Sequence, residues 1–207
     1  GVQTCALPIS LAQAPTSDPL RRNVWNANLK VADVANRSGG NPEARTHLEA
    51  ALKIATDRSK AFPEDIRYTQ ALALTHRRLG EIATGMNDFE AAKLQHAAAL
   101  SLFQQVATIS GTTADRGQVV RALYRLADVD VRQESKTNAQ AGYEAGVNLA
   151  KQLVVEEPKN ITFLLDLVQG LEKLGDIAGM SDQGMAAKEN YLAAISARET
   201  LATLDPS

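Results

Sequence analysis

The chain has 207 residues, of which 44% are hydrophobic, 22% charged and 4% aromatic, with a net charge of −2 and one cysteine. A chain of this length can bury a core without a metal ion, and one cysteine cannot form an intrachain disulfide. The balance of 22 basic and 24 acidic residues disfavours a nucleic-acid or membrane-surface protein, and no apolar run approaches the ~20 residues of a membrane span.

The first nine residues, GVQTCALPI, resemble the translation of a short-read sequencing adapter. We expect residues 1–9 to be non-native and exclude them from the fold, together with Cys5. The alternative is a genuine N-terminus such as a signal-peptide fragment, but the segment lacks a basic leading region. If residues 1–9 are non-native, the true start of the gene is missing, and residues 10–207 are the part to interpret.

An internal repeat of 47 to 48 residues organises the rest of the chain. The first recurring segment is an apolar residue, a small residue, an acidic residue and another apolar residue, at positions 31–34, 79–82, 126–129 and 174–177. A second set recurs at the same spacing, and it includes the column Leu48, His96, Tyr143 and Tyr191. Boundary residues recur likewise at Pro15, Pro63, Gly111, Pro158 and Pro206. We therefore predict four units, approximately 16–63, 64–111, 112–158 and 159–206.

Each unit is predicted to contain two helices. Apolar and small residues recur at intervals of three, four and seven, as at Leu48, Ala51, Leu52 and Ala55, which is the helical period. Turns are predicted at 38–42, 85–88, 133–138 and 179–182. We expect glycine to adopt the left-handed conformation that ends the first helix, and Asn41, Asp88 or Asp182 to cap the second.

These columns resemble those of the tetratricopeptide repeat, in which Leu-Gly on a first helix is followed by an Ala…Tyr…Ala-Leu pattern on a second. The resemblance covers residues 10–207, although the period is longer than the usual value of about 34. It implies an all-α fold, a right-handed superhelical solenoid of about eight helices in antiparallel pairs. HEAT-type pairs, which have a similar period, are the architectural alternative. The long period also resembles repeat arrays of bacterial multidomain signalling proteins.

Two columns lead to specific packing predictions. Gly80 and Gly175, matched by Ala32 and Ala127, are expected where the two helices of a unit approach most closely, because small residues permit close backbones. A second column of larger residues is expected to fill the space between neighbouring units: Leu52, Leu100, Val147 and Ile195.

The candidate binding surface is the concave face that the family lines with first helices. The register places an acidic column there, with a basic residue three positions earlier in each unit. The candidate residues are Lys30, Asp33, Arg78, Glu81, Arg125, Asp128, Lys173 and Asp176. Residues at i and i+3 on a helix are neighbours, so the alternative is a row of exposed ion pairs that neutralise each other.

No motif indicates catalysis or a bound cofactor. His76 and His96 are expected on facing helices, but no further ligand has metal-binding spacing, and we predict that His96 packs in the core. Trp25 and Tyr124 are either binding anchors or core residues. We find no phosphate-binding loop, nucleophile elbow or HExxH motif. We therefore predict no catalytic, cofactor-binding or metal-binding residues.

The functional hypothesis is a non-catalytic scaffold that binds a protein or peptide, not nucleic acid or membrane. One alternative is a regulatory or docking segment of a larger signalling enzyme, such as a bacterial serine/threonine protein kinase. Another is a helical-repeat protein that binds nucleic acid, which the mixed charges disfavour.

A stacked array needs polar caps at its ends. Neither end of this chain has one, so we expect a fragment of a longer array. We expect its location to be cytoplasmic.

Overall fold

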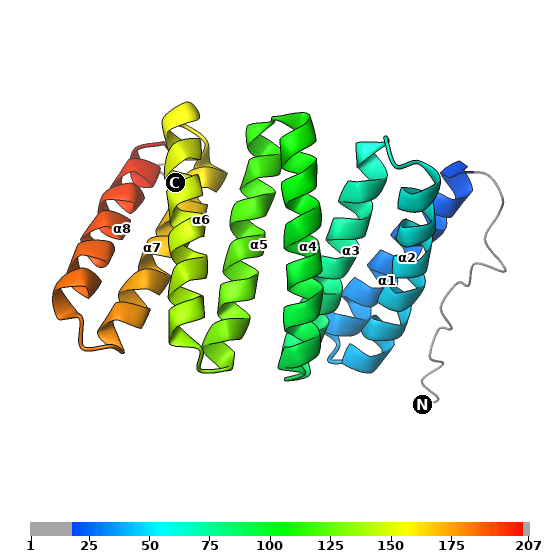
Figure 1. Cartoon of the computed structure of the whole chain (residues 1–207), viewed down its shortest axis with the longest axis horizontal. Helices are drawn as coiled ribbons and strands as arrows, with labels where there is room; N and C mark the ends of the chain where they lie inside the picture. The colour runs from blue at the N-terminus through cyan, green and yellow to red at the C-terminus, as the bar shows by residue number, and fades with distance from the viewer. Residues whose placement is uncertain (1–17, 205–207) are drawn as a thin grey trace. The chain divides into compact units, whose positions relative to one another are not determined.

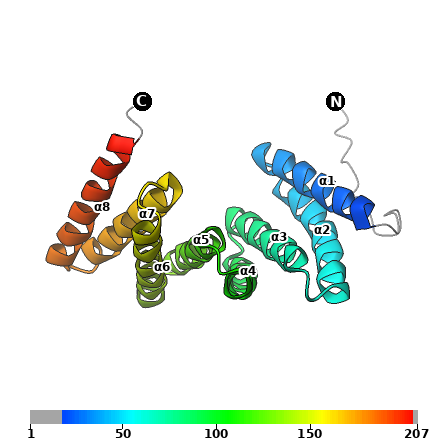
Figure 2. The ribbon, with the colours of Figure 1, turned by 90° about the horizontal axis from the view of Figure 1, so that it is seen from above.

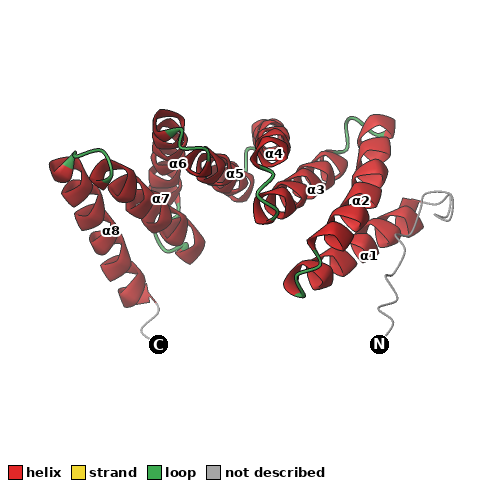
Figure 3. Ribbon diagram, turned by 90° about the horizontal axis from the view of Figure 1, so that it is seen from below, coloured by secondary structure: helices red, strands yellow, loops and turns green. Residues whose placement is uncertain are grey.

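The computed structural model describes residues 18–204, and within them the chain forms eight helices and no strand (Figures 1 and 3). The predicted all-α fold is confirmed. Residues 1–9, which resemble the adapter, lie outside the described residues, as do Pro15 and Pro206. The helices are α1 (Asp18–Arg37), α2 (Asn41–Ala61), α3 (Ile66–Gly85), α4 (Phe89–Ser110), α5 (Thr113–Arg132), α6 (Lys136–Glu156), α7 (Ile161–Gly179) and α8 (Gly184–Leu204).

The chain divides into two compact parts, and the boundary between them falls within α4, after Leu102. In the N-terminal part, residues 18–102, α2 packs against both α1 and α3. In the C-terminal part, residues 103–204, α6 packs against α5 and α7, and α7 also packs against α8 (Figure 2). Within each part, these successive helices are therefore joined by short turns and pack side by side.

In three of the helix pairs, a polar side chain caps the N-terminus of the first helix. The side chain of Asp65 accepts a hydrogen bond from the backbone N–H of Arg67 at 3.1 Å. In the same way, Thr112 accepts from the backbone N–H of Asp115 at 3.2 Å, and Asn160 accepts from that of Thr162 at 3.1 Å. Such N-caps satisfy backbone donors that have no partner within the helix. The preceding helices α2 and α6 end at Ala61 and Glu156, two residues before Pro63 and Pro158, which cannot continue a helix.

The turn within each pair uses one repeated backbone hydrogen bond. The carbonyls of Ala35, Ala83, Asp130 and Ala178 each accept from the N–H five residues later, at 2.8 to 3.0 Å. This 6→1 bond is the mark of a Schellman ending and requires a left-handed residue close to the helix end. That residue is Gly39 in the first pair, as predicted, but Asn87, Glu134 and Asp182 in the others.

Two of the predicted turn roles are wrong. The residue that caps α2 is Gly40, so Asn41 lies inside the helix, and Asp182 takes the left-handed position instead of capping α8. The prediction for Asp88 is confirmed, because its carboxylate accepts from Ala91 N–H at 3.2 Å. Asn and Asp tolerate a positive φ better than most residues, since their short polar side chains bond locally.

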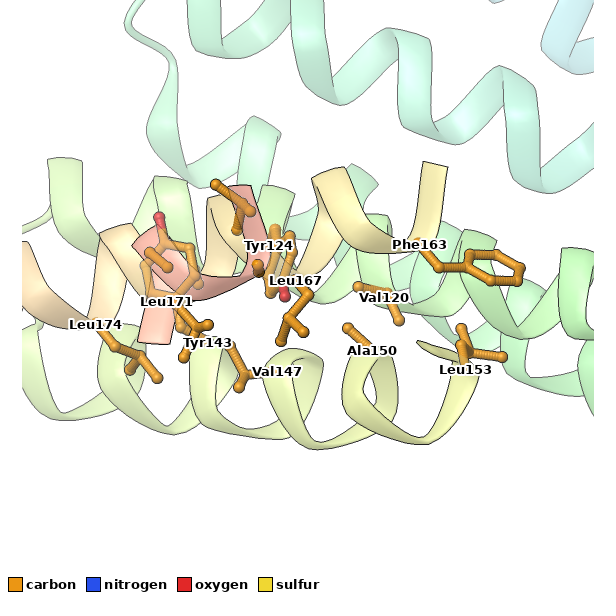
Figure 4. Packing of buried hydrophobic residues seen from close by; sticks show 14 of the residues in the cluster. Val120, Tyr124, Tyr143, Val147, Ala150, Leu153, Phe163, Leu167, Leu171 and Leu174 are labelled. Atoms are coloured by element: carbon orange, nitrogen blue, oxygen red, sulfur yellow. The ribbon is translucent and has the colours of Figure 1, made fainter. Parts of the chain in front are cut away.

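Each part has its own apolar core. In the N-terminal part, α1, α2 and α3 contribute Leu29, Ala32, Ala35, Ala44, Leu48, Ala51, Leu79 and Ile82. In the C-terminal part, the core lies between α5, α6 and α7 and extends to α8, and Figure 4 shows Tyr124 and Tyr143 at its centre. Leu153 and Phe163 close the cluster at one end in the same view.

The small column does lie at the contact between the two helices of a pair, but its glycines make room for a ring of the second helix and not for a second backbone. A Cβ atom added to Gly80 would lie 2.6 to 2.8 Å from the ring of His96, and one on Gly175 would lie 2.6 to 2.9 Å from the ring of Tyr191. Real Cβ atoms essentially never come so close to another heavy atom. Glycine at these positions therefore lets a large ring of the second helix lie against the backbone of the first.

The column predicted to fill the space between units behaves unevenly. Val147 is buried at 3% exposure, and Leu52 and Leu100 are half-buried. Ile195 is 51% exposed, so the prediction is wrong for this residue. The physical reason is that, in the part of the chain that the structure describes, no helix follows α8 to cover it.

Candidate functional site

The charged columns of the N-terminal part form ion pairs, but not all in the predicted i, i+3 pattern. Arg78 on α3 pairs with Asp33 on α1, which links the first helices of two successive pairs. Glu81 lies 3.8 Å from Arg77, one turn earlier on its own helix. Lys30 on α1 is exposed. The structure thus brings Asp33 and Arg78 together across two helices, a contact that spacing along one helix did not indicate.

The C-terminal part follows the predicted pattern. Arg125 and Asp128 lie 3.6 Å apart, and Lys173 and Asp176 lie 3.9 Å apart, each pair on one helix. Both carboxylates also accept a hydrogen bond from a tyrosine hydroxyl of the second helix. Tyr191 donates to Asp176 at 2.8 Å, and Tyr143 on α6 donates to Asp128. The columns are therefore largely paired within the chain, and exposed pairs of this kind contribute little to stability.

The three histidines serve packing and hydrogen bonding. His47 is buried and bonds Asn28 at 2.9 Å, while His76 bonds Gln95 at 2.8 Å. His96 is 3% exposed beneath Gly80, so its predicted packing role is confirmed. Among residues 18–204, no group of three or more His, Cys, Asp or Glu side chains is arranged to hold a metal ion.

Tyr124, one of the two aromatic anchor candidates, is a core residue. It is 1% exposed, and its hydroxyl is buried without a hydrogen-bond partner. Burial raises the pKa of this hydroxyl well above its ordinary value, and the nearby Asp166 adds to the effect. An external partner cannot reach this ring without unpacking α5.

Trp25, the second candidate, lines a cavity of about 270 Å³ in the N-terminal part. The indole N–H donates to Thr75 Oγ at 2.9 Å, which holds the ring on the cavity wall. The cavity lies between α1, α2 and α3, and its lining is mainly apolar. Its lining residues are Asp18, Arg22, Trp25, Ile54, Ala55, Arg58, Arg67, Tyr68, Gln70, Ala71 and Leu74.

One wall of this cavity is a bonded cluster of charged and aromatic side chains. Arg58 pairs with Asp18, and Tyr68 donates its hydroxyl hydrogen to the same carboxylate at 2.5 Å. The Arg58 guanidinium also lies 4.3 Å from the centre of the Phe62 ring and 5.1 Å from that of Tyr68. Cation–π contacts of this kind add to the ion pair and help to hold the guanidinium in place.

The rim of the cavity is basic. Arg67 is bound to Asp65 at 2.6 Å, and this hydrogen bond lowers the pKa of the Asp65 carboxyl. Arg22 adds a further exposed guanidinium. An apolar lining with a basic rim suits an apolar group attached to a carboxylate. The sequence singled out Trp25 alone, because the other lining residues come from three helices and share no spacing.

No model of a known protein family matches the sequence, and no curated protein matches it. Solved structures do resemble it. BtubC (BKLC) from P. vanneervenii aligns with a TM-score of 0.69 and 18% identity, over 89% of this chain and 72% of that one. The de novo designed helical repeat protein DHR64 aligns with a TM-score of 0.53 and 18% identity, over 90% and 98% of the two chains. The DHF58 filament protein aligns with a TM-score of 0.50 and 17% identity, over 89% of this chain and 95% of that one.

These similarities establish a helical-repeat fold and nothing finer, because the three sequence identities are only 17 to 18%. The tetratricopeptide assignment stays a prediction. No helix among the described residues is both long and apolar enough to cross a membrane.

Proposed function

We propose that this helical-repeat chain is a non-catalytic scaffold that binds a protein or peptide segment, with the α1–α3 cavity as the site that receives its anchor. The observation that carries the proposal is the cavity beside Trp25, an apolar space of about 270 Å³ with arginines at its rim. The volume lies at the lower end of the ~300 to 1,000 Å³ that is typical of ligand sites, and it has room for one large side chain.

The chemistry of the rim selects the kind of segment. Arg58 is already paired with Asp18, and Arg67 with Asp65, so these guanidinium groups are largely neutralised within the chain. Arg22 is exposed beside them and leaves the rim with a positive excess. The segment that fits has an apolar anchor residue next to an acidic one, since a carboxylate beside Arg22 would form a charge-assisted hydrogen bond.

The experiment is selection of peptides on the whole chain from a random library, followed by affinity measurement on variants. We expect a consensus with an apolar residue beside Asp or Glu, and at least a tenfold loss of affinity for Arg22→Glu. The matched control is Arg132→Glu, a charge reversal at another exposed arginine, the last residue of α5. Absence of any enriched consensus, or equal binding to both variants, contradicts the proposal.

The charged columns of the first helices are a second surface for the same function. Asp128 and Asp176 are held by tyrosine hydroxyls, and this fixes their orientation. Arg125→Gln removes one positive charge from the column and keeps both groups of the Asp128 hydrogen bond. If partners bind the columns, this variant weakens binding and salt screens the interaction; if they bind only the cavity, it has no effect.

The repeat type and cellular context belong to the same proposal. A tetratricopeptide-like register is supported by the Gly80–His96 and Gly175–Tyr191 contacts, which join the two columns that carry the resemblance. A cytoplasmic signalling context, including attachment to an enzyme, follows from that resemblance alone. Sequencing native DNA across the codon of Ser10 tests both the adapter interpretation and the attachment of further domains.

A further inference from the structure

The helices α1, α2 and α3 have the same order and the same register as α5, α6 and α7. Asp18 and Ile66 begin α1 and α3, and the equivalent residues Thr113 and Ile161 begin α5 and α7. In each set, two first helices lie side by side and share a second helix that packs against both. The residues that fill the gap between the first helices can therefore be compared position by position.

The gap between α5 and α7 is filled by an acidic side chain of the chain itself. Asp166 on α7 accepts a hydrogen bond from Arg121 on α5 at 2.7 Å, and Asp166 is only 6% exposed. One turn earlier on both helices, the Phe163 ring lies against Gly117, where an added Cβ atom would be 2.9 Å from the ring. A carboxylate held by an arginine of the neighbouring first helix therefore bridges α5 and α7.

The equivalent place between α1 and α3 has no such carboxylate. Ala71 on α3 occupies the position of Asp166, and Asn26 on α1 occupies that of Arg121. Ala71 lines the α1–α3 cavity together with Arg22, which lies one turn before Asn26 and is exposed. This gap thus offers space and a guanidinium group at the place where α7 supplies a carboxylate.

The cavity lies on the side of α1 that faces α3. The indole of Trp25 on α1 donates to Thr75 on α3 at 2.9 Å, and Asp33 on α1 forms an ion pair with Arg78 on α3. Both walls of the gap are therefore described helices in contact with each other. The shape of the cavity is set by side chains of α1, α2 and α3, all of which contribute to its lining.

We propose that Ala71 makes the cavity specific for acidic segments, because it leaves a slot that an Asp or Glu of the bound segment fills as Asp166 fills the α5–α7 gap. The inference rests on the proposed function and assigns the acidic residue of the segment to a place between Ala71 and Arg22, with the apolar anchor beside it against Trp25. Burial raises the pKa of the Asp166 carboxyl despite Arg121. The cost of burial is smaller in the slot, since Ala71 is half-buried and Arg22 is exposed.

The test uses the full chain and two capped peptides, acetyl-Gly-Phe-Glu-Gly-amide and the same peptide with Gln in place of Glu. Trp25 is the only tryptophan of the chain and lines the cavity, so its fluorescence reports binding there. We expect the Glu peptide to bind about tenfold more tightly than the Gln peptide, because a carboxylate forms charge-assisted hydrogen bonds with a guanidinium and an amide does not.

Two substitutions test the slot directly. Asn26→Arg adds a guanidinium at the position of Arg121, so it should tighten binding of the Glu peptide and leave the Gln peptide unchanged. Addition of Ala71→Asp to this variant recreates the Arg121–Asp166 pair between α1 and α3, and it should abolish the preference for the Glu peptide. The double variant keeps the net charge of the wild type, so general repulsion cannot cause that loss. Asn26→Gln, which adds length without charge, is the matched control and should bind like the wild type.

Circular dichroism melting of each variant shows whether it folds. Should the double variant fail to fold, Ala71→Asn replaces it, because it fills the slot without charge and should also abolish the preference. Equal affinity of the wild type for both peptides overturns this inference and leaves the proposed function standing, as does a filled slot that keeps the preference or an Asn26→Arg variant that gains no affinity. Failure of both peptides to bind any variant overturns the proposed function and this inference with it.

Discussion

Tyr143 on α6 donates its hydroxyl hydrogen to Asp128 on α5 at 2.5 Å, and the same bond recurs one repeat later between Tyr191 and Asp176. Burial raises the pKa of the Tyr143 hydroxyl, and the hydrogen bond to Asp128 raises it further. The bond ties the acidic column of a first helix to the aromatic column of its second helix. The acidic column, which is a candidate binding surface, therefore also helps to hold the two helices of a pair together.

Replacement of Tyr143 by Phe should lower the free energy of unfolding by about 1 to 3 kcal/mol, because a buried hydroxyl loses a charged acceptor. The measurement is urea denaturation followed by circular dichroism. Tyr191→Phe is the matched variant, and because Tyr191 is 39% exposed it should change the free energy of unfolding much less. Equal losses for the two variants would show that burial does not control the contribution of this bond.

Replacement of Tyr124 by Phe should have the opposite effect. Its hydroxyl is buried without a hydrogen-bond partner, so removing it relieves a desolvation penalty. We expect a gain of up to about 1 kcal/mol in the free energy of unfolding, reduced by the small void that the missing oxygen leaves. A loss larger than that gain would indicate an undetected partner, such as a buried water, at this hydroxyl.

Gly80→Leu should destabilise the chain by about 1 to 3 kcal/mol or more, since its Cβ alone would collide with the His96 ring. Thermal melting measures the loss. Gly179→Leu is the control, because a Cβ there meets no heavy atom within 4 Å. The second substitution His96→Ala should recover part of the stability of Gly80→Leu. If Gly80→Leu/His96→Ala is no more stable than Gly80→Leu, the loss of stability does not come from a collision with the His96 ring.

The stability of the chain should depend on the ionisation of Asp166 in acid. Burial raises the pKa of this carboxyl, although Arg121, at 2.7 Å, acts in the opposite direction. The folded state therefore keeps a proton that the unfolded chain loses near 3.8, and the contribution of Asp166 falls as the pH rises above that value. The measurement is the difference in unfolding free energy between wild type and Asp166→Asn as the pH rises from below 3.8 to neutral. A difference that grows with pH would mean that the Arg121 ion pair outweighs burial.

The helical pairs and their register could be predicted from the sequence, because both depend on local spacing. Residues three, four and seven apart share a helix face in any fold, and the 47 to 48 residue period identifies equivalent positions. The contacts of Gly80 with His96 and of Gly175 with Tyr191 follow from that register. The turns were harder to predict, since Asn41 and Asp182 each favour several positions in a turn and the backbone selects one.

By itself, then, the sequence determined the helical class, the helix pairs and the equivalence of Val147 with Ile195. Only the tertiary structure decided which equivalent residues are covered, because coverage depends on a neighbouring helix that lies far away in sequence. It likewise decided that Asp33 pairs with Arg78 and that Trp25, Ile54 and Leu74 line one cavity. These residues have no common period, and three packed helices bring them together.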